Sequence, residues 1–131
     1  MELRALLLLP LCFPGLQAQS PDSEIRLSEG STLYIHCPYT AQADYRQQKA
    51  WCRVRDGQCD LLVETMYPTQ YPYPTRAAKG NVSIVDDPMH GTVSITMTNL
   101  QAEDSGTYSC VSRSYSYGYF LLRTLSLIVF K

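Results

Sequence analysis

The chain has 131 residues, which is room for one domain, and its formal net charge is −1. This balance argues against a nucleic-acid partner, because phosphate backbones are held by an excess of lysine and arginine. Only two histidines are present, and neither stands in a recognisable order with a nucleophile, so the composition also argues against an enzyme.

The N-terminus is typical of a secretory signal. Residues 1–4 include the positive charge of Arg4, residues 5–13 (ALLLLPLCF) are apolar, and the segment PGLQA ends at the small residue Ala18. We expect cleavage after Ala18, with cleavage after Gly15 as the alternative. The predicted domain is therefore residues 19–131, and no later segment approaches the roughly 18 apolar residues that span a membrane.

Short alternating segments dominate the rest of the chain. Apolar and polar residues alternate in STLYIHC (31–37), TVSITMT (92–98) and TLSLIV (124–129), which is the period of half-buried antiparallel strands. Turn signals separate them at residues 29–30, 56–57, 87–88 and 90–91. The fold class is therefore predicted to be all-β, either a sandwich or a barrel.

Four cysteines follow the signal, and an even number in a secreted domain predicts disulfides. Trp51 should face the core, so the pleat directs its neighbour Cys52 to the opposite face. Cys37 shares the inward side of its strand, and Cys110 lies two residues after a tyrosine that is also expected inside. Of the three possible connectivities, alternation predicts a core bridge from Cys37 to Cys110, which leaves Cys52 to pair with Cys59 outside the core.

The spacing of these residues resembles a known family. Trp51 follows Cys37 by 14 residues, and DSGTYSC ends at Cys110 with Tyr108 two residues before it. This order is similar to the immunoglobulin pattern of cysteine, strand-C tryptophan, corner tyrosine and cysteine. The resemblance implies a V-type immunoglobulin sandwich of two antiparallel sheets with Greek-key connections, with Trp51 and Tyr108 in its core.

Longer segments narrow the resemblance. KAWCR, VDDP and TMTNLQAEDSGTYSC resemble the triggering receptors expressed on myeloid cells (the TREM family), whereas CDLLVET and NVSIVDD look equally like the leukocyte mono-Ig-like receptors. We favour the TREM resemblance. It implies that the Cys52–Cys59 bridge joins strands C and C′, that no cofactor is bound, and that the domain recognises an extracellular protein, glycan or lipid ligand for an innate immune receptor.

The wider role has open alternatives. A signalling adaptor is expected only if a transmembrane segment follows Lys131, and a soluble decoy is expected if the chain ends there. The rival functions are a homotypic adhesion or assembly immunoglobulin module and a leukocyte mono-Ig-like receptor that binds lipid.

Tyrosines concentrate in three predicted loops. Tyrosine offers a large amphipathic area with few torsions to freeze, which suits a binding surface. The alternative is that these rings cap the end of the sandwich or pack on Trp51. The candidate ligand residues are Tyr39, Tyr45 and Arg46 in the first loop, Tyr67, Tyr71 and Tyr73 in the second, and Arg113, Tyr115, Tyr117, Tyr119 and Phe120 in the third.

Charged residues predict one structural contact. Alternation turns Arg53 inward, where its guanidinium can reach the turn that holds Asp104, so we expect an ion pair between them. Many V-type domains brace this end with an arginine at the start of strand D, but the matching position here is Asn81. The positive charge that pairs with Asp104 is therefore expected from Arg53, Arg76 or Lys79.

Two further surface features are predicted. The sequon Asn81-Val82-Ser83 is a candidate glycosylation site, with an unmodified surface amide as the alternative. The acidic segment at residues 86–88 is interpreted as a plain turn, because a calcium site needs more oxygen ligands at defined spacing.

An association face is also expected. If Cys52 and Cys59 face outward, alternation also turns Leu61 and Val63 outward, near Val111. Exposed apolar residues on such a sheet often mark a contact surface.

Overall fold

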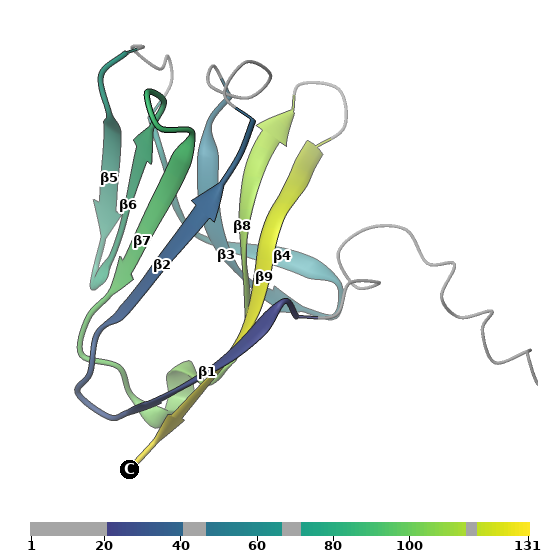
Figure 1. Ribbon diagram of the computed structural model, residues 1–131. Coiled ribbons are helices and arrows are strands. Elements are labelled where there is room, and N and C mark those ends of the chain that lie inside the picture. Colours follow the sequence, from purple (N-terminus) through teal and green to yellow (C-terminus); the bar gives the residue numbers. More distant parts are fainter. Residues whose placement is uncertain (1–20, 41–46, 67–71, 115–117) are drawn as a thin grey trace, which may run out of the picture.

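The computed structural model describes residues 21–40, 47–66, 72–114 and 118–131. Within these ranges the chain forms nine strands and one short 3-10 helix (Figure 1), and none of its helices is long and apolar enough to cross a membrane. The elements are β1 Ser23–Ser28, β2 Leu33–Pro38, β3 Lys49–Arg55, β4 Gln58–Glu64, β5 Thr75–Lys79, β6 Val82–Asp87, β7 Thr92–Met97, the 3-10 helix Ala102–Asp104, β8 Gly106–Ser114 and β9 Gly118–Phe130.

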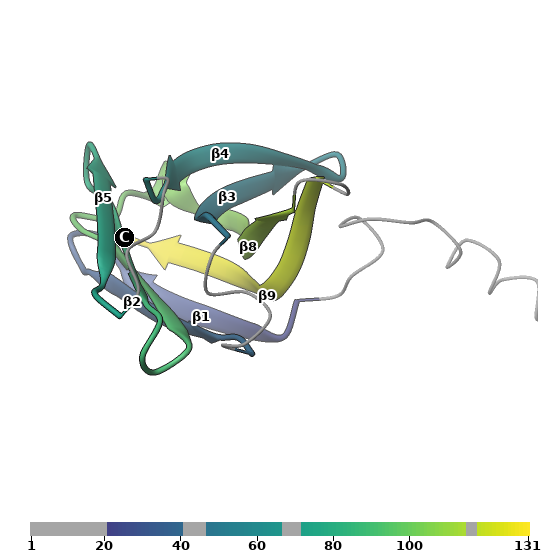
Figure 2. The same ribbon diagram turned by 90° about the horizontal axis from the view of Figure 1, so that it is seen from above.

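The strands form two sheets that face each other. The first has the order β1-β9-β8-β3-β4 and the second the order β2-β7-β6-β5, and Figure 2 shows the strands of both sheets from above. Every pairing is antiparallel except that of β1 with β9. The predicted V-type immunoglobulin sandwich is therefore confirmed, and the alternating segments at residues 31–37, 92–98 and 124–129 lie in β2, β7 and β9.

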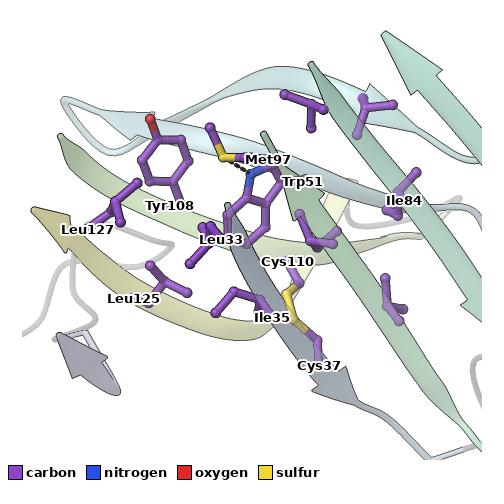
Figure 3. Close-up of a cluster of buried hydrophobic side chains, with 14 of the residues drawn as sticks. Leu33, Ile35, Cys37, Trp51, Ile84, Met97, Tyr108, Cys110, Leu125 and Leu127 are labelled. Carbon is purple, nitrogen blue, oxygen red and sulfur yellow. Dashed lines mark hydrogen bonds between the residues drawn. A yellow bond between two sulfur atoms is a disulfide. The ribbon is translucent and has the colours of Figure 1, made fainter. Parts of the chain in front are cut away.

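The core lies between the sheets around the single tryptophan. Trp51 has no exposed surface and stacks on Tyr108, with ring centroids 5.4 Å apart. Its indole Nε1 donates to the sulfur of Met97 at 3.3 Å. The disulfide between Cys37 and Cys110 joins the two sheets beside these rings (Figure 3). Burial of these apolar side chains is the main favourable term in the stability of the sandwich.

A tyrosine corner closes the turn before β8. The hydroxyl of Tyr108 donates to the carbonyl oxygen of Asp104 at 2.5 Å. The carboxylate of Asp104 accepts the backbone N–H of Gln101 at 2.8 Å and so caps the 3-10 helix. Burial raises the pKa of Tyr108.

A β-bulge changes the predicted outer face. The register between β3 and β4 shifts at Trp51 and Cys52, so Cys52 pairs with Leu61 while Trp51 pairs with Val63. Leu61 faces outward and is 44% exposed, but Val63 lies in the core at 5%. The prediction that Val63 faces outward is therefore wrong, because the extra residue of a bulge reverses the alternation beyond it.

Candidate functional site

The three predicted loops connect strand ends at one end of the sandwich. The ends of β2, β4 and β8 and the starts of β3, β5 and β9 lie there together with the β6–β7 turn, away from the C-terminus of the chain (Figure 1). We call this the loop-bearing end. Among the predicted ligand residues, the structure describes Tyr39, Tyr73, Arg113, Tyr119 and Phe120. The others lie outside the described residues, namely Tyr45, Arg46, Tyr67, Tyr71, Tyr115 and Tyr117.

A buried ion pair lies beneath this end. Nζ of Lys49 is 3.1 Å from Oδ2 of Asp86, and neither side chain is more than 1% exposed. The hydroxyl of Tyr39 donates to Oδ1 of Asp86 at 2.5 Å, and the Lys49 ammonium lies 4.2 Å from the Tyr39 ring centroid. Burial raises the pKa of Asp86, against the lowering effect of the Tyr39 hydrogen bond and the Lys49 charge.

The plain-turn interpretation of the acidic segment therefore needs correction at Asp86, because this residue belongs to β6 and its side chain is buried. Tyr39 likewise packs against the core and is bonded to Asp86, so its hydroxyl serves the framework. Alternation in the sequence could have indicated that Asp86 is buried, because Val82, Ile84 and Asp86 lie on the same side of β6. Among the described residues, no group of three or more histidine, cysteine or acidic side chains could hold a metal ion.

Hydrogen bonds from the ion pair tie the loop-bearing strand ends together. The backbone N–H of Lys49 donates to Oγ1 of Thr65 at 2.9 Å, and the N–H of Thr65 donates to the carbonyl of Lys49 at 2.8 Å. Nζ of Lys49 also donates to the carbonyl of Gln47 at 2.8 Å, and the side chain of Gln47 accepts a bond from the Ser112 hydroxyl at 2.7 Å. Together with the Lys49–Asp86 pair, these bonds join the start of β3 to the ends of β4, β6 and β8, and we call these joined strand ends the base of the loop-bearing end.

A second charged cluster joins β4, β8 and β9. Arg113 donates from Nε and Nη2 to the two carboxylate oxygens of Glu64 at 2.7 and 2.9 Å, and its Nη2 donates to the Tyr119 hydroxyl at 2.8 Å. The hydrogen bond with Glu64 raises the pKa of Arg113, and burial raises the pKa of Tyr119. Arg113 and Tyr119 were both predicted to contact ligand, and in the structure they are hydrogen-bonded to each other. The Arg113 side chain is still 42% exposed.

Exposed apolar side chains gather at the same end. In the described part of the chain, seven large apolar or aromatic side chains are exposed. Four of them flank the loops of the loop-bearing end, namely Met66, Tyr73, Met89 and Phe120, at 66%, 67%, 61% and 55% exposure. The sequence had singled out only Tyr73 and Phe120, because single methionines in turns give no periodic signal.

The second disulfide lies on the outer face of the first sheet, and it joins Cys52 to Cys59. Cys52 faces away from the core as alternation predicts, yet it has no exposed surface. Ala50, Cys52 and Val111 form a second apolar cluster, against which Cys59, Tyr119 and Leu121 pack. Neighbouring side chains of this outer face therefore cover Cys52. Leu61, which pairs with Cys52 in the register, is exposed.

The predicted ion pair between Arg53 and Asp104 is not formed among the described residues. Nη2 of Arg53 donates to the carbonyl oxygens of Glu103 and Ser105 at 3.1 and 2.5 Å. The guanidinium thus reaches the expected turn, but it binds the backbone on both sides of Asp104. The Asp104 carboxylate instead accepts the N–H of Gln101 through Oδ2.

The sequon asparagine is on the surface at the opposite end. Asn81 is exposed, and its Nδ2 donates to the carbonyl oxygen of Thr98 at 2.5 Å. Arg76 and Lys79, the alternative charge donors, are both exposed on β5; Lys79 pairs with Val82 beside Asn81, whereas Arg76 pairs with Val85 toward the loop-bearing end.

Comparisons with known proteins agree with this fold. The immunoglobulin V-set domain profile matches residues 19–130. The chain is 38% identical to natural cytotoxicity triggering receptor 2 of Homo sapiens over 109 residues, which is 82% of this chain and 38% of that receptor. It is 37% identical to human triggering receptor expressed on myeloid cells 1 over 91 residues, 69% of this chain and 38% of the receptor.

The mouse protein triggering receptor expressed on myeloid cells 2 is 38% identical over 85 residues, which is 63% of this chain and 37% of that receptor. The chain thus spans somewhat over a third of the length of these curated relatives. The same kind of domain is indicated by the V-set match, the inter-sheet bridge, the tyrosine corner and these relatives. The chain belongs to the immunoglobulin V-set family, and its homologues include the triggering receptors expressed on myeloid cells.

Proposed function

We propose that this domain is the extracellular ligand-recognition part of an innate immune receptor, and that the loop-bearing end is its ligand surface. The observation that carries the proposal is the placement of Met66, Tyr73, Met89 and Phe120, four exposed apolar side chains, around that end. The receptor names of the relatives support the same role.

The physical argument has two parts. Exposed apolar side chains that gather at one place often mark a binding surface, because burying them against a partner is favourable. The base beneath them is fixed by the Lys49–Asp86 pair and the Glu64–Arg113 pair. A rigid base lowers the entropy cost of binding, since fewer groups must be ordered when the ligand arrives.

The predicted loop residues would extend this surface. Tyr45, Tyr67, Tyr71, Tyr115 and Tyr117 belong to the segments that join the same strand ends. Together with Tyr73 they would supply amphipathic area beside the apolar side chains. A ligand that buries apolar surface fits best, and extracellular proteins, glycans and lipids are the classes to compare.

The test uses the domain itself as the probe. The biotinylated domain is assembled on streptavidin and applied to leukocyte and epithelial cell panels, to phospholipid vesicles and to immobilised glycans. Met66→Ser, Met89→Ser and Phe120→Ser are each expected to lower binding about tenfold or more, with little change in Tm. Phe130→Ser is the matched control, because Phe130 is 46% exposed at the far end of β9. Equal binding by all four variants would place the ligand surface elsewhere.

The route to the cell surface is part of the proposal. With cleavage after Ala18, the secreted domain begins at residue 19, and N-terminal sequencing of the secreted protein distinguishes this start from one at residue 16. Signal relay through an adaptor would require a transmembrane segment after Lys131, and without one the domain would act as a soluble decoy.

A homotypic module is the second candidate, favoured by one observation. Leu61 is exposed on the outer face of the first sheet beside the Cys52–Cys59 bridge. Sedimentation equilibrium of the wild type and Leu61→Glu decides this case. A dimer that Leu61→Glu dissociates would favour it, and a wild-type monomer at high concentration would exclude it.

A further inference from the structure

The outer face of the second sheet carries rows of uncharged side chains, four of which bear hydroxyl groups, namely Tyr34, Ser83, Ser94 and Thr96. The register places Ser83 of β6 beside Thr96 of β7 and Thr96 beside Tyr34 of β2. The next row is Val85, Ser94 and His36. All six belong to the outward positions of strands whose alternate residues are buried. We call these six residues the hydroxyl face.

The hydroxyl face is flat, weakly charged and open. Its titratable side chains are Tyr34 and His36, and Nδ1 of His36 shares a hydrogen bond of 3.1 Å with Oγ of Ser94. Formal charges lie at its borders: Arg76 on β5, Asp87 at the end of β6, and Arg123 of β9, which donates to the carbonyl oxygen of His36 at 3.0 Å. Tyr34 is 70% exposed, the largest exposure among the apolar and aromatic side chains of the described residues. Such a face suits a neutral, hydroxyl-rich partner.

The sequon asparagine stands at the edge of this face. Asn81 directly precedes β6, and its carbonyl accepts the N–H of Thr98 at 3.0 Å, which continues the β6–β7 pairing by one more row. Val82 is buried, so alternation turns both Asn81 and Ser83 outward. Asn81 therefore lies at the edge of the hydroxyl face, at the turn between β5 and β6 (Figure 1).

We propose that Asn81 carries an N-linked glycan that lies across the hydroxyl face and packs on the ring of Tyr34. The proposal rests on the extracellular location given above, because the glycan is added in the secretory pathway. It does not depend on any ligand of the loop-bearing end. The glycan would cover the outer side of β6, β7 and β2 and leave the proposed ligand surface free.

The covalent step is a glycosyl transfer from a polyprenyl diphosphate oligosaccharide. Nδ2 of Asn81 forms a bond to the anomeric carbon of the first sugar and loses one of its two protons to a base of the transferase. The bond from that carbon to the donor diphosphate breaks, and the diphosphate leaves with its electron pair. Nδ2 keeps one N–H, so its hydrogen bond to the Thr98 carbonyl can persist after modification.

The distance from Asn81 to Tyr34 matches a branched core glycan. From Asn81, Tyr34 lies two strands across the sheet and two residues along the strand. With a strand spacing of about 4.8 Å and a rise of about 3.3 Å per residue, the separation of the two residues is on the order of 12 Å. The first sugar would therefore lie near Ser83 and Thr96, and later sugars would reach Tyr34. There the C–H side of a sugar ring can cover an aromatic face that is otherwise in water.

Occupancy is tested by mass. The chain is secreted from animal cells, and its intact mass is compared before and after treatment with peptide N-glycosidase. We expect a glycan mass on the wild type, its loss in Asn81→Gln and in Ser83→Ala, and its retention in Ser83→Thr, which keeps the sequon. A wild type without glycan mass would overturn the proposal.

Packing is tested by a thermodynamic cycle on the glycosylated protein. The high-mannose glycoform is compared with the same protein trimmed to a single sugar, in the wild type and in Tyr34→Thr. Trimming is expected to lower the wild-type Tm by about 4 °C and to leave the Tm of Tyr34→Thr unchanged, because the two sites are coupled. In the unglycosylated Asn81→Gln background, Tyr34→Thr should change Tm little. Equal effects of trimming with and without Tyr34 would overturn the packing.

Discussion

Nζ of Lys49 lies 3.1 Å from Oδ2 of Asp86, and both side chains are buried at the first residue of β3 and near the end of β6. The pair therefore links the two sheets at the end where the loops leave them. A buried pair contributes less than its Coulomb attraction suggests, but removing one partner is costly because the other charge stays in a low-dielectric site.

We predict that Asp86→Asn lowers the free energy of unfolding by about 3 kcal/mol, because it leaves the Lys49 ammonium buried beside a neutral amide. Urea denaturation followed by tryptophan fluorescence measures the change. Asp87→Asn is the matched control, since the Asp87 carboxylate is on the surface and pairs with His90, and it should cost less than about 1 kcal/mol. A similar loss in both variants would contradict the role of the buried pair.

The Asp87 carboxylate should show a pH effect of its own. The hydrogen bond from His90, 2.8 Å away, lowers the pKa of Asp87 in the folded state. A lowered folded pKa means that the contribution to stability is complete above the unfolded-chain pKa and is lost as pH falls through the folded value. We expect His90→Gln to raise the Asp87 pKa in a carbon-13 carboxyl titration, while Met89→Ser in the same turn leaves it in place.

The two disulfides should differ in their importance for stability. The residues of the core bridge, Cys37 and Cys110, are 73 apart, and those of the Cys52–Cys59 bridge are 7 apart. The chain-entropy model gives about 4 kcal/mol for the first loop and about 2 kcal/mol for the second. We expect Cys52→Ala/Cys59→Ala to remain folded with a lower Tm, and Cys37→Ala/Cys110→Ala to fail to fold at 37 °C.

Non-reducing peptide mapping is the direct check on these pairs. Fragments that link residue 37 to residue 52 would contradict the alternation argument, because Cys37 points into the core from β2 of the second sheet, whereas Cys52 points away from it on β3 of the first sheet.

Gly106 should resist enlargement because Arg53 packs against it. A Cβ at Gly106 would lie 3.0 Å from both Nε and Nη2 of Arg53. The guanidinium would have to leave the carbonyls of Glu103 and Ser105, so Gly106→Ala should destabilise the fold by about 1–2 kcal/mol. In an Arg53→Ala background the same substitution should cost less. Equal cost in both backgrounds would point to a backbone effect.

Among the tyrosines of the segment predicted as the third loop, those that bind ligand should separate from Tyr119, which the structure places in β9. We predict that Tyr115→Ala and Tyr117→Ala abolish binding of the tetrameric domain to cells and leave Tm unchanged. Tyr119→Ala should lower Tm, because its ring packs on the outer cluster and its hydroxyl accepts a bond from Arg113. Thermal denaturation and cell staining on the same preparations distinguish the two effects. Unchanged staining by the Tyr115 and Tyr117 variants would remove them from the ligand surface.

Alternation along single strands was enough to predict much of this protein. Side chains on a pleated strand alternate between faces, so Trp51 and Cys52 had to point in opposite directions. That local rule, with the spacing of Cys37 and Cys110, led to the sandwich and to both disulfides that the structure contains. The TREM resemblance added the family, which the relatives support.

Contacts between distant strands depended on the tertiary structure. The bulge at Trp51 that turns Val63 inward is a property of the pairing between β3 and β4. The Lys49–Asp86 pair joins residues of two sheets, and Arg53 donates to the carbonyls of Glu103 and Ser105 while the Asp104 carboxylate caps the N–H of Gln101. A sequence states which face of a strand each residue occupies, whereas only the folded chain decides what lies opposite that face.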